Sequence, residues 1–248
     1  MKKIEDKIKG TRFHAHKDMV HESARYLDAM KAYYNQLLDI VDKKLQLNDK
    51  SNVLEIGSYL GYFAASLRQK YNCIVSGMDH PDVFNDDVIK LYEELEIIPI
   101  KQDLSNYNAE FNKFNFIFCF ETLEHLSVNI FELIESITRS LKPNGYLILS
   151  VPNINSLKKR TKLLFGKQIL NDFSILTDSK SPDFYLGVHW HEYNIKEISN
   201  LVKLNGYNIE YATTMNIKGN RNLFIIKNIL TKIIPNSGDS ILIIGKKL

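Results

Sequence analysis

Apolar and polar positions along this chain follow two different periods. Between residues 16 and 47, apolar side chains recur every three or four positions, which predicts one long amphipathic helix or two consecutive ones. Farther along, short apolar runs of strand length alternate with stretches of helical spacing. The runs that we predict to be strands lie at residues 53–56, 73–78, 97–100, 114–120, 146–151, 208–213 and 240–245.

Turn and capping residues mark the helix boundaries. Residues 60–71 have helical spacing, and so do residues 130–141, which the KPNG sequence at 142–145 brings to an end. Asn194, with Glu197 three positions later, matches a capping box, and Gly206 marks the end of the helix that follows. Strands that alternate with such helices predict an α/β fold, with a doubly wound, mostly parallel sheet after a helical N-terminal segment.

The composition narrows the class of protein without identifying a function. With 248 residues, of which 44% are hydrophobic and 25% charged, the chain fits a globular domain with a full-sized core, and two cysteines exclude a disulfide scaffold. Thirty-two basic against 29 acidic residues argue against a nucleic-acid-binding protein. No apolar run approaches the roughly 20 residues of a membrane span, and the charged N-terminus lacks signal-peptide character. We therefore expect a cytoplasmic protein.

The sharpest motif is the turn after the first predicted strand. The sequence VLEIGSYLGYFA, at 53–64, places Gly57 and Gly61 between a buried strand and the start of a helix. The free N–H groups and the dipole of such a helix start attract an anionic group. The spacing G-x-x-x-G differs from the dinucleotide fingerprint G-x-G-x-x-G. The alternative is that both glycines only allow the strand and the helix to pack closely.

Acidic residues accompany three successive predicted strands. Glu55 lies in the first strand, Asp79 ends the second, 22 positions after Gly57, and Asp103 follows the third. An acid about 20 positions beyond a glycine turn can accept hydrogen bonds from ribose hydroxyls, and one at Asp103 can accept from the amine of an adenine. Any one of these acids could instead cap a helix. Together they favour a ligand site at the carboxyl ends of the strands.

Taken in order, these motifs resemble those of the class I S-adenosylmethionine-dependent methyltransferases. VLEIGSYLGYFA resembles the first motif of that family, GMDH at 77–80 its ribose-binding step, and DL at 103–104 its adenine-binding step. FNFIFCFETLEHL at 114–126, LKPNGYLILSVPN at 141–153 and HEYNIKEISNLVKLNGYNI at 191–209 resemble its later motifs. The resemblance covers about residues 50–213, apart from the stretch 154–188.

The resemblance implies a Rossmann-like sheet of seven strands with an antiparallel last strand. It also implies S-adenosylmethionine as the cofactor and S-adenosylhomocysteine as the product. Residues 49–248 would form the methyltransferase domain, and residues 1–48 a helical lid, unless the segment 12–17 is only a frayed arm. The residues that the resemblance assigns to the cofactor site are Glu55, Gly57, Ser58, Gly61, Asp79, His80, Asp103, Leu104, Phe120 and Glu121.

The glycine loop departs from the family pattern at one position. The family's loop usually reads E-x-G-x-G-x-G, and Tyr59 stands here in place of the middle glycine. Its side chain must point away from the ligand, or the methionine end of the cofactor sits differently. This departure leaves open a catalytically silent protein that binds S-adenosylmethionine or acts as a scaffold. The other alternative is a nicotinamide-dependent oxidoreductase, although the glycine spacing does not match and no Tyr-x-x-x-Lys pair lies at the expected place.

Methyl transfer to a hydroxyl needs a group that takes up the proton, and three histidines are the candidates. His125 lies four positions after Glu121 at a predicted helix start, so both side chains are expected on one face. An extended 188–191 segment would place His189 and His191 on one face as well. This His-x-His pair with the glutamate after it could be part of a metal site, but no third ligand lies at a characteristic spacing, so we predict no metal. The structural alternatives are a capping contact for His125 and anchoring of the loop by the other two.

Residues 154–190 form an insertion on the predicted acceptor side. Five basic residues and no acid lie within 156–167 among apolar residues at helical spacing, so this stretch is either a solvated helix face or a cap over an anionic acceptor. The insertion resembles that of methyltransferases acting on bacterial surface-polysaccharide precursors, which implies a sugar hydroxyl or a nucleotide-linked group. We expect a monomer or homodimer that acts on a small phosphorylated or nucleotide-linked molecule. The predicted acceptor contacts are His14, Arg160, Trp190 and Tyr193.

Overall fold

The computed structural model describes residues 1–11, 22–170, 188–217 and 221–248. This described part of the chain divides into two compact units. One unit consists of Met1–Phe118 with Arg139–Gly145, and the other of Cys119–Thr138 with Tyr146–Leu248.

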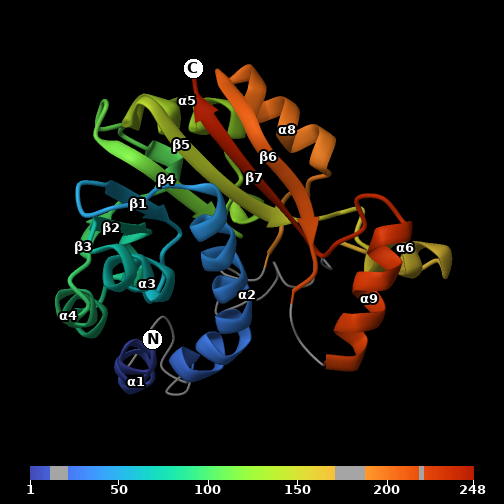
Figure 1. The fold of residues 1–248 in the computed structure, drawn as a ribbon, viewed down its shortest axis with the longest axis horizontal. Coiled ribbons are helices and arrows are strands. Elements are labelled where there is room, and N and C mark those ends of the chain that lie inside the picture. Colours follow the sequence, from blue (N-terminus) through green and yellow to red (C-terminus); the bar gives the residue numbers. More distant parts are fainter. Residues whose placement is uncertain (12–21, 171–187, 218–220) are drawn as a thin grey trace. The chain divides into compact units, whose positions relative to one another are not determined.

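The first unit contains the N-terminal helices and the strands that precede residue 119 (Figure 1). Its helices are α1 (Lys2–Gly10), α2 (Glu22–Lys44), α3 (Tyr62–Tyr71) and α4 (Asp86–Glu94), with two short 3₁₀ turns, η1 (Pro81–Val83) and η2 (Leu104–Asn106). Its strands are β1 (Asn52–Ile56), β2 (Ile74–Asp79), β3 (Ile98–Lys101) and the first part of β4 (Phe114–Phe120). Strand β2 lies between β1 and β3 and is parallel to both.

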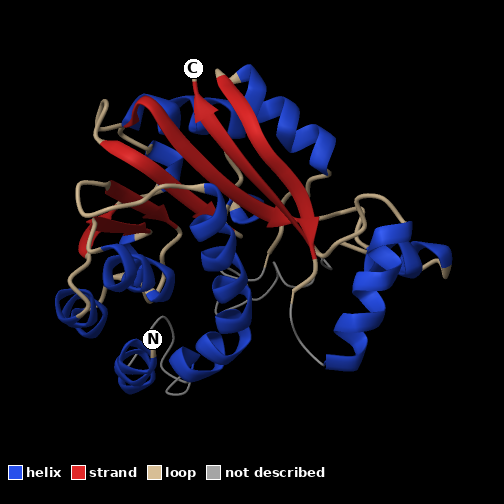
Figure 2. Ribbon diagram, viewed as in Figure 1, coloured by secondary structure: helices blue, strands red, loops and turns tan. Residues whose placement is uncertain are grey.

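The second unit contains most of the remaining elements. Its helices are most of α5 (Ile130–Ser140), α6 (Leu157–Leu164), α8 (Ile195–Leu204) and α9 (Arg221–Ile233), together with the 3₁₀ turn η3 (Leu123–His125). Its strands are the larger part of β5 (Leu141–Pro152), β6 (Tyr207–Met215) and β7 (Ser240–Lys247). Strand β7 lies between β5 and β6 and is antiparallel to both, and α8 packs along β6 (Figure 2).

The seven strands follow one another in the order β3-β2-β1-β4-β5-β7-β6. The chain progresses outward from β1 in one direction and then from β4 in the other, so the order has a switch point between these two strands. The last strand in sequence, β7, is inserted antiparallel between β5 and β6. This arrangement confirms the predicted Rossmann-like α/β fold with a mostly parallel sheet and an antiparallel last strand.

Apolar strands and aromatic helix faces make up the core of the first unit. Helix α3 begins with a continuous buried run at residues 62–67, and the ring of Phe63 packs edge to face on Phe118 with centroids 5.2 Å apart. From α2, the Tyr34 ring lies against those of Tyr62 and Phe63. Each such buried side chain contributes about 1.5–3 kcal/mol. Helix α2 therefore completes the core of this unit.

Most of the predicted elements are confirmed, and the exceptions have local causes. Strand β5 begins at Leu141 instead of 146, because the KPNG turn stays within the strand, with Asn144 in the left-handed region at a φ of 60°. Helices α1, α4 and α9 were not predicted, and α1 buries only Ile4 and Ile8, too few apolar positions to show a period. Among the helices of the described ranges, none combines the length and apolar character needed to cross a membrane.

Gly61 is required both by its backbone conformation and by its neighbours. Its φ is +69°, and a Cβ there would lie 2.8 Å from Ile97 Cδ1. We expect Gly61→Ala to lower the Tm by more than Gly166→Ala, where φ is +64° but a Cβ would meet nothing within 4 Å. The left-handed conformation costs an alanine about 1–2 kcal/mol at either site, whereas crowding adds about 1–3 kcal/mol only at Gly61. Equal Tm shifts in thermal denaturation would contradict close packing at Gly61.

Candidate active site

The loop between β1 and α3 is tied closely to β2. Gly57, Tyr59 and Gly61 have φ values of 73°, 46° and 69°. The backbone N–H groups of Gly57 and Ser58 both donate to the carbonyl oxygen of Met78, at 2.9 and 3.1 Å. The buried Ser58 hydroxyl donates to the same carbonyl at 3.1 Å. Two amides at the turn are therefore used inside the fold instead of facing a ligand.

The Glu55 carboxylate lies at the start of α3. Its Oε2 accepts a hydrogen bond from the backbone N–H of Ala64 at 2.9 Å. The helix has no acid in its first turn and no side-chain cap of its own, so Glu55 supplies the negative charge that a helix N-terminus favours. Burial raises the pKa of Glu55 well above its usual value, the Ala64 hydrogen bond lowers it, and Asp79 raises it further. A carboxylate is thus held inside the fold next to the glycine loop.

Asp79 ends β2 with its carboxylate turned back to the glycine loop. One oxygen accepts a hydrogen bond from the Tyr59 N–H at 2.7 Å, and the other accepts from the His80 N–H at 2.8 Å. Burial raises the pKa of Asp79, and these two hydrogen bonds oppose that rise. The structure thereby brings the predicted residues Asp79 and His80 together with the loop.

Asp103 and Leu104 lie at the turn after β3. Asp103 accepts a hydrogen bond from the Ser105 N–H at 2.8 Å, which caps η2 and holds the pKa of this carboxyl below its usual value. The Nε2 atom of His80 is 3.9 Å from an Asp103 oxygen, and both side chains are about half exposed. The capping contact that was the alternative for Asp103 is therefore present, and the carboxylate also lies beside the predicted residue His80.

The Tyr59 side chain, which replaces a glycine, packs against α2. Its ring meets that of Tyr26 edge to face, with centroids 4.4 Å apart and an interplanar angle of 63°. The Tyr26 hydroxyl is hydrogen-bonded to that of Tyr34 at 2.7 Å, and burial raises the pKa of both tyrosines. The sequence leaves the direction of Tyr59 open and does not single out Tyr26, whose only signal is its place in an amphipathic helix. His14 and the rest of segment 12–17 lie outside the described residues, and a lid formed by residues 1–48 stays a prediction.

In the second unit, Phe120 and Glu121 lead from β4 into η3. Phe120 is buried, and the Glu121 backbone is left-handed with a φ of 46°. The Glu121 carboxylate accepts a hydrogen bond from the Ser240 hydroxyl at 2.8 Å. The helix start predicted for Glu121 and His125 is wrong, because residues 123–125 form a single 3₁₀ turn. The spacing of four positions therefore does not place these two side chains on one helical face.

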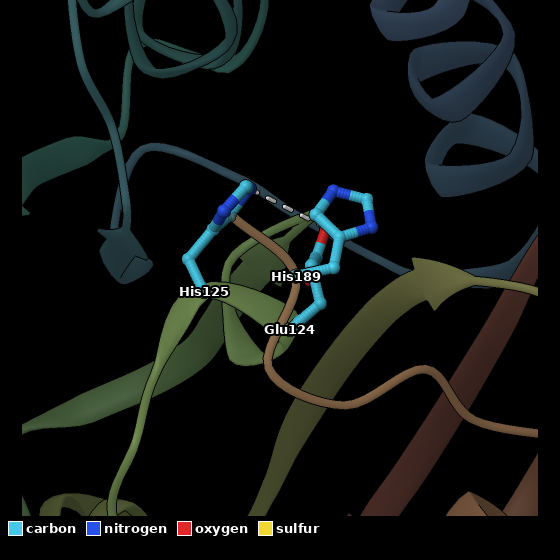
Figure 3. A group of neighbouring side chains, drawn as sticks. All are labelled: Glu124, His125 and His189. Atoms are coloured by element: carbon cyan, nitrogen blue, oxygen red, sulfur yellow. Dashed lines mark ion pairs between the residues drawn. The ribbon is translucent and has the colours of Figure 1, made fainter. Parts of the chain in front are cut away.

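Glu124, His125 and His189 form a compact group (Figure 3). The rings of His125 and His189 lie edge to face, with centroids 4.9 Å apart. His125 Nδ1 is 3.0 Å from the carbonyl oxygen of Val188, and its Nε2 is 3.8 Å from a Glu124 oxygen. Burial lowers the pKa of His125 to about 4, and the neighbouring His189 lowers it as well. The His125 ring is therefore neutral at physiological pH.

His189 and His191, which were predicted on one face, bind different acids. His189 Nδ1 is 2.8 Å from one Glu192 oxygen, and Lys159 Nζ binds the other. Burial alone would raise the pKa of Glu192, and the hydrogen bonds from His189 and Lys159 outweigh it and lower that pKa. His191 Nε2 is 2.7 Å from an oxygen of Glu197, in the capping box of α8. The chain bends at residue 190, so the extended 188–191 segment on which the shared face depended is not present.

Three further residues were predicted to contact the acceptor. The Trp190 backbone N–H donates to the Glu124 carbonyl oxygen at 2.7 Å, and Trp190 is about half exposed. Tyr193 is buried. The Arg160 guanidinium donates to two backbone carbonyl oxygens, at 2.7 and 3.1 Å. These contacts anchor the chain, and a role in binding an acceptor stays a prediction for all three.

Helix α6 confirms the helix predicted for the basic stretch 156–167. A cavity of about 370 Å³ opens beside it. Its lining combines basic and apolar side chains, among them Lys158, Lys162, Lys167, Lys227 and Phe165. Lys227 comes from α9 and is paired with Asp239 at 2.6 Å. The cavity therefore offers positive charge beside an aromatic ring.

Comparisons with known proteins place this architecture in a family. Residues 24–212 match a family model described as a methyltransferase domain. A search of curated proteins found no match.

Solved structures that share the fold are SAM-dependent methyltransferases by their descriptions. One from Thermotoga maritima is 18% identical, with 96% of this chain and 100% of that chain covered and a TM-score of 0.63. Phosphoethanolamine N-methyltransferase 2 from Haemonchus contortus, in complex with S-adenosyl-L-methionine, is 15% identical, with 98% of this chain and 60% of that chain covered and a TM-score of 0.61. One from Methanosarcina mazei is 20% identical, with 84% and 97% covered and a TM-score of 0.57. These likenesses show a shared fold.

The matched residues include the glycine loop, the acids of β1 to β3, and the segments that hold the three candidate histidines. A nicotinamide-dependent oxidoreductase, one of the alternatives from the sequence, is therefore set aside. Since the family model spans most of the chain, this protein belongs to the methyltransferase family.

Proposed function

We propose that this protein transfers a methyl group from S-adenosylmethionine to a small acceptor and releases S-adenosylhomocysteine. The observation that carries the proposal is the set of acids Glu55, Asp79 and Asp103 at or after the ends of β1, β2 and β3, around one glycine loop. In open α/β sheets, ligands bind outside the carboxyl ends of the strands, near the switch point of the strand order. Structures with the same fold that are described as SAM-dependent methyltransferases support this function.

Each acid has a role in this proposal. Bound S-adenosylmethionine supplies a methyl group that is already reactive toward a nucleophile. Asp79 accepts hydrogen bonds from the ribose hydroxyls, Asp103 accepts one from the adenine amine, and Glu55 provides negative charge for the cationic amino group. Of the remaining predicted contacts, Gly57, Ser58, Gly61, His80 and Leu104 belong to the first unit, and Phe120 and Glu121 belong to the second. Their contact with the cofactor stays a prediction.

For the acceptor, we infer an oxygen of a small anionic molecule, such as a phosphorylated or nucleotide-linked sugar. The lysines of the α6 cavity support an anionic group. The acceptor oxygen bonds to the methyl carbon while the carbon–sulfur bond breaks, and its proton passes to a base. Among the three candidate histidines, His125 is held neutral with a pKa of about 4 and is a weak base, which favours His189 over it.

The ribose role predicts that Asp79→Ala binds the cofactor weakly. Calorimetry with S-adenosylmethionine should show one site per chain, with affinity at least about tenfold lower in the variant, because a hydrogen bond to a charged group contributes about 1.5–3 kcal/mol. Asp82→Ala, which removes an exposed carboxylate from η1, should bind like the wild type. Thermal denaturation must show that both variants fold, since Asp79 also holds the Tyr59 N–H. No binding by the wild type at millimolar ligand would overturn the proposed function.

Glu55→Gln should raise stability and weaken cofactor binding. Glutamine keeps an acceptor for the Ala64 N–H and removes the buried charge. Because the folded-state pKa of Glu55 is raised, the wild type loses stability as the pH rises from the unfolded-state pKa through the folded-state pKa, and the variant does not.

The Tm of Glu55→Gln should therefore exceed that of the wild type at about pH 8, and the gap should close as the pH falls toward about 4.3, the usual pKa of Glu. Each unit by which the pKa is raised corresponds to about 1.4 kcal/mol, and about 1 kcal/mol moves the Tm of a domain of this size by roughly 2–4 °C. Calorimetry should show weaker binding of S-adenosylmethionine in the same variant. A lower Tm than the wild type at about pH 8 would contradict a buried, charged Glu55.

His189→Ala should lower turnover and leave cofactor affinity nearly unchanged. Formation of S-adenosylhomocysteine is measured over a panel of sugar phosphates, nucleotide sugars and phosphoethanolamine. Methylation of phosphoethanolamine would reveal a nitrogen acceptor in place of an oxygen. We expect a loss of at least about 100-fold, the lower end of what a general base provides, and a larger loss than in His191→Ala. Equal losses of turnover and cofactor affinity would mean that the segment around His189 has a structural role instead of a catalytic one. Cofactor binding by the wild type without turnover on any acceptor would favour a catalytically silent protein.

A further inference from the structure

Three potential metal ligands gather where η3 meets the segment before α8. We propose that Glu124, His125 and His189 bind one divalent transition-metal ion (Figure 3). One ligand atom from each of these side chains lies within 4.8 Å of the other two. All three residues belong to the second unit, so the site depends on that unit alone. This inference replaces the expectation of no metal.

Glu124 brings a buried carboxylate to the group. Its side chain is 1% exposed, and its Oε2 is buried without a hydrogen-bond partner in the described structure. The Oε1 atom is 3.8 Å from His125 Nε2, which is too far for a hydrogen bond. Glu121 and Glu192 add negative charge nearby, and Lys159 is the cation that opposes it. A buried carboxylate in these surroundings is costly, and a bound cation would compensate for it.

Both histidines are oriented through Nδ1, which leaves Nε2 to bind an ion. The Val188 carbonyl oxygen, 3.0 Å from His125 Nδ1, can only accept, so Nδ1 carries the proton and Nε2 keeps its lone pair. His189 Nδ1 is held in the same way by the Glu192 carboxylate at 2.8 Å. Metal-binding histidines are commonly held by a backbone carbonyl or a carboxylate at the other ring nitrogen. The structure therefore supplies the supporting contacts as well as the ligands.

The donor set indicates the class of ion. Two imidazole nitrogens and one carboxylate oxygen suit Zn²⁺, Fe²⁺ or Co²⁺ better than Mg²⁺ or Ca²⁺, which prefer oxygen ligands. A tetrahedral ion with bonds of about 2.1 Å separates its ligand atoms by about 3.4 Å. The ligand atoms of the three side chains lie within 4.8 Å of one another, so they would approach one another by up to about 1.4 Å to bind the ion. Three protein ligands leave at least one coordination position open, as in catalytic zinc sites.

The open position gives the ion a role that rests on the proposed function. A divalent ion lowers the pKa of an oxygen bound to it, so an acceptor hydroxyl at this position would release its proton to water more readily. His125 and His189 would then serve as ligands, and no histidine would be needed as the base. The binding of the ion itself does not depend on this role.

Metal titration of tag-free protein that has been freed of metal by a chelator tests the site. Calorimetry should show one Zn²⁺ or Co²⁺ per chain and binding of Mg²⁺ at least about tenfold weaker. Bound Co²⁺ should also acquire visible absorption bands. Glu192→Gln should weaken Zn²⁺ binding about 10- to 100-fold, as expected for a residue that orients a ligand, and Glu124→Gln and His189→Ala should weaken it further.

The matched control is His191→Ala, which removes an exposed histidine two positions from His189 and should leave one site of full affinity. Thermal denaturation separates folding from binding, because Zn²⁺ should raise the Tm of the wild type and leave that of a folded Glu124→Gln unchanged. No saturable binding to the wild type, or binding that survives both ligand substitutions, would overturn the site. Metal binding without cofactor binding would reject only the proposed function, and cofactor binding without metal binding would reject only this inference.

Discussion

One hydrogen bond, from the Ala64 N–H to the Glu55 carboxylate, ties β1 to the start of α3, and the rest of the first unit is built around it. Because the strand and the helix are held so close together, the chain between them must turn within a few residues, and it does so through three left-handed positions. That tight loop brings its amides to the Met78 carbonyl oxygen at the end of β2. Asp79, the next residue, then meets the Tyr59 N–H. The position of Asp79, the ribose-binding candidate, thus depends on a carboxylate in the neighbouring strand β1.

The two units accommodate buried or partly buried carboxylates in different ways. Glu55 and Asp79 accept hydrogen bonds from backbone N–H groups, which lessens the cost of burial without adding a positive charge. Glu124 has one buried oxygen with no such donor in the described structure. Burial raises the pKa of all three. Because such carboxylates lower stability, selection for stability alone would remove them. Their presence is consistent with a role in binding ligands.

The features that the sequence predicts well are local ones. The apolar runs, the glycine loop and the capping box of Asn194 and Glu197 depend on neighbouring residues, and the structure has them where they were expected. The direction of Tyr59 was not predictable, because it depends on α2, which precedes β1. The group of Glu124, His125 and His189 was not predictable either, because it joins segments far apart in the sequence. The spacing of residues around His189 cannot show that η3 supplies the other two side chains. The prediction of a helix starting at Glu121 was wrong, because a 3₁₀ turn of three residues is too short for the sequence pattern to distinguish it from a helix start.

The edge-to-face contact between Tyr26 and Tyr59 has a consequence for the history of this protein. A left-handed backbone at a residue other than glycine costs about 1–2 kcal/mol, and an aromatic pair returns about 0.5–1.5 kcal/mol. Glycine at position 59 would need no partner, whereas tyrosine there needs one on α2. A substitution at position 59 therefore depends on the residue at position 26. Among homologous chains, an aromatic residue at one of them should co-vary with an aromatic residue at the other, so that the helix and the loop have changed together.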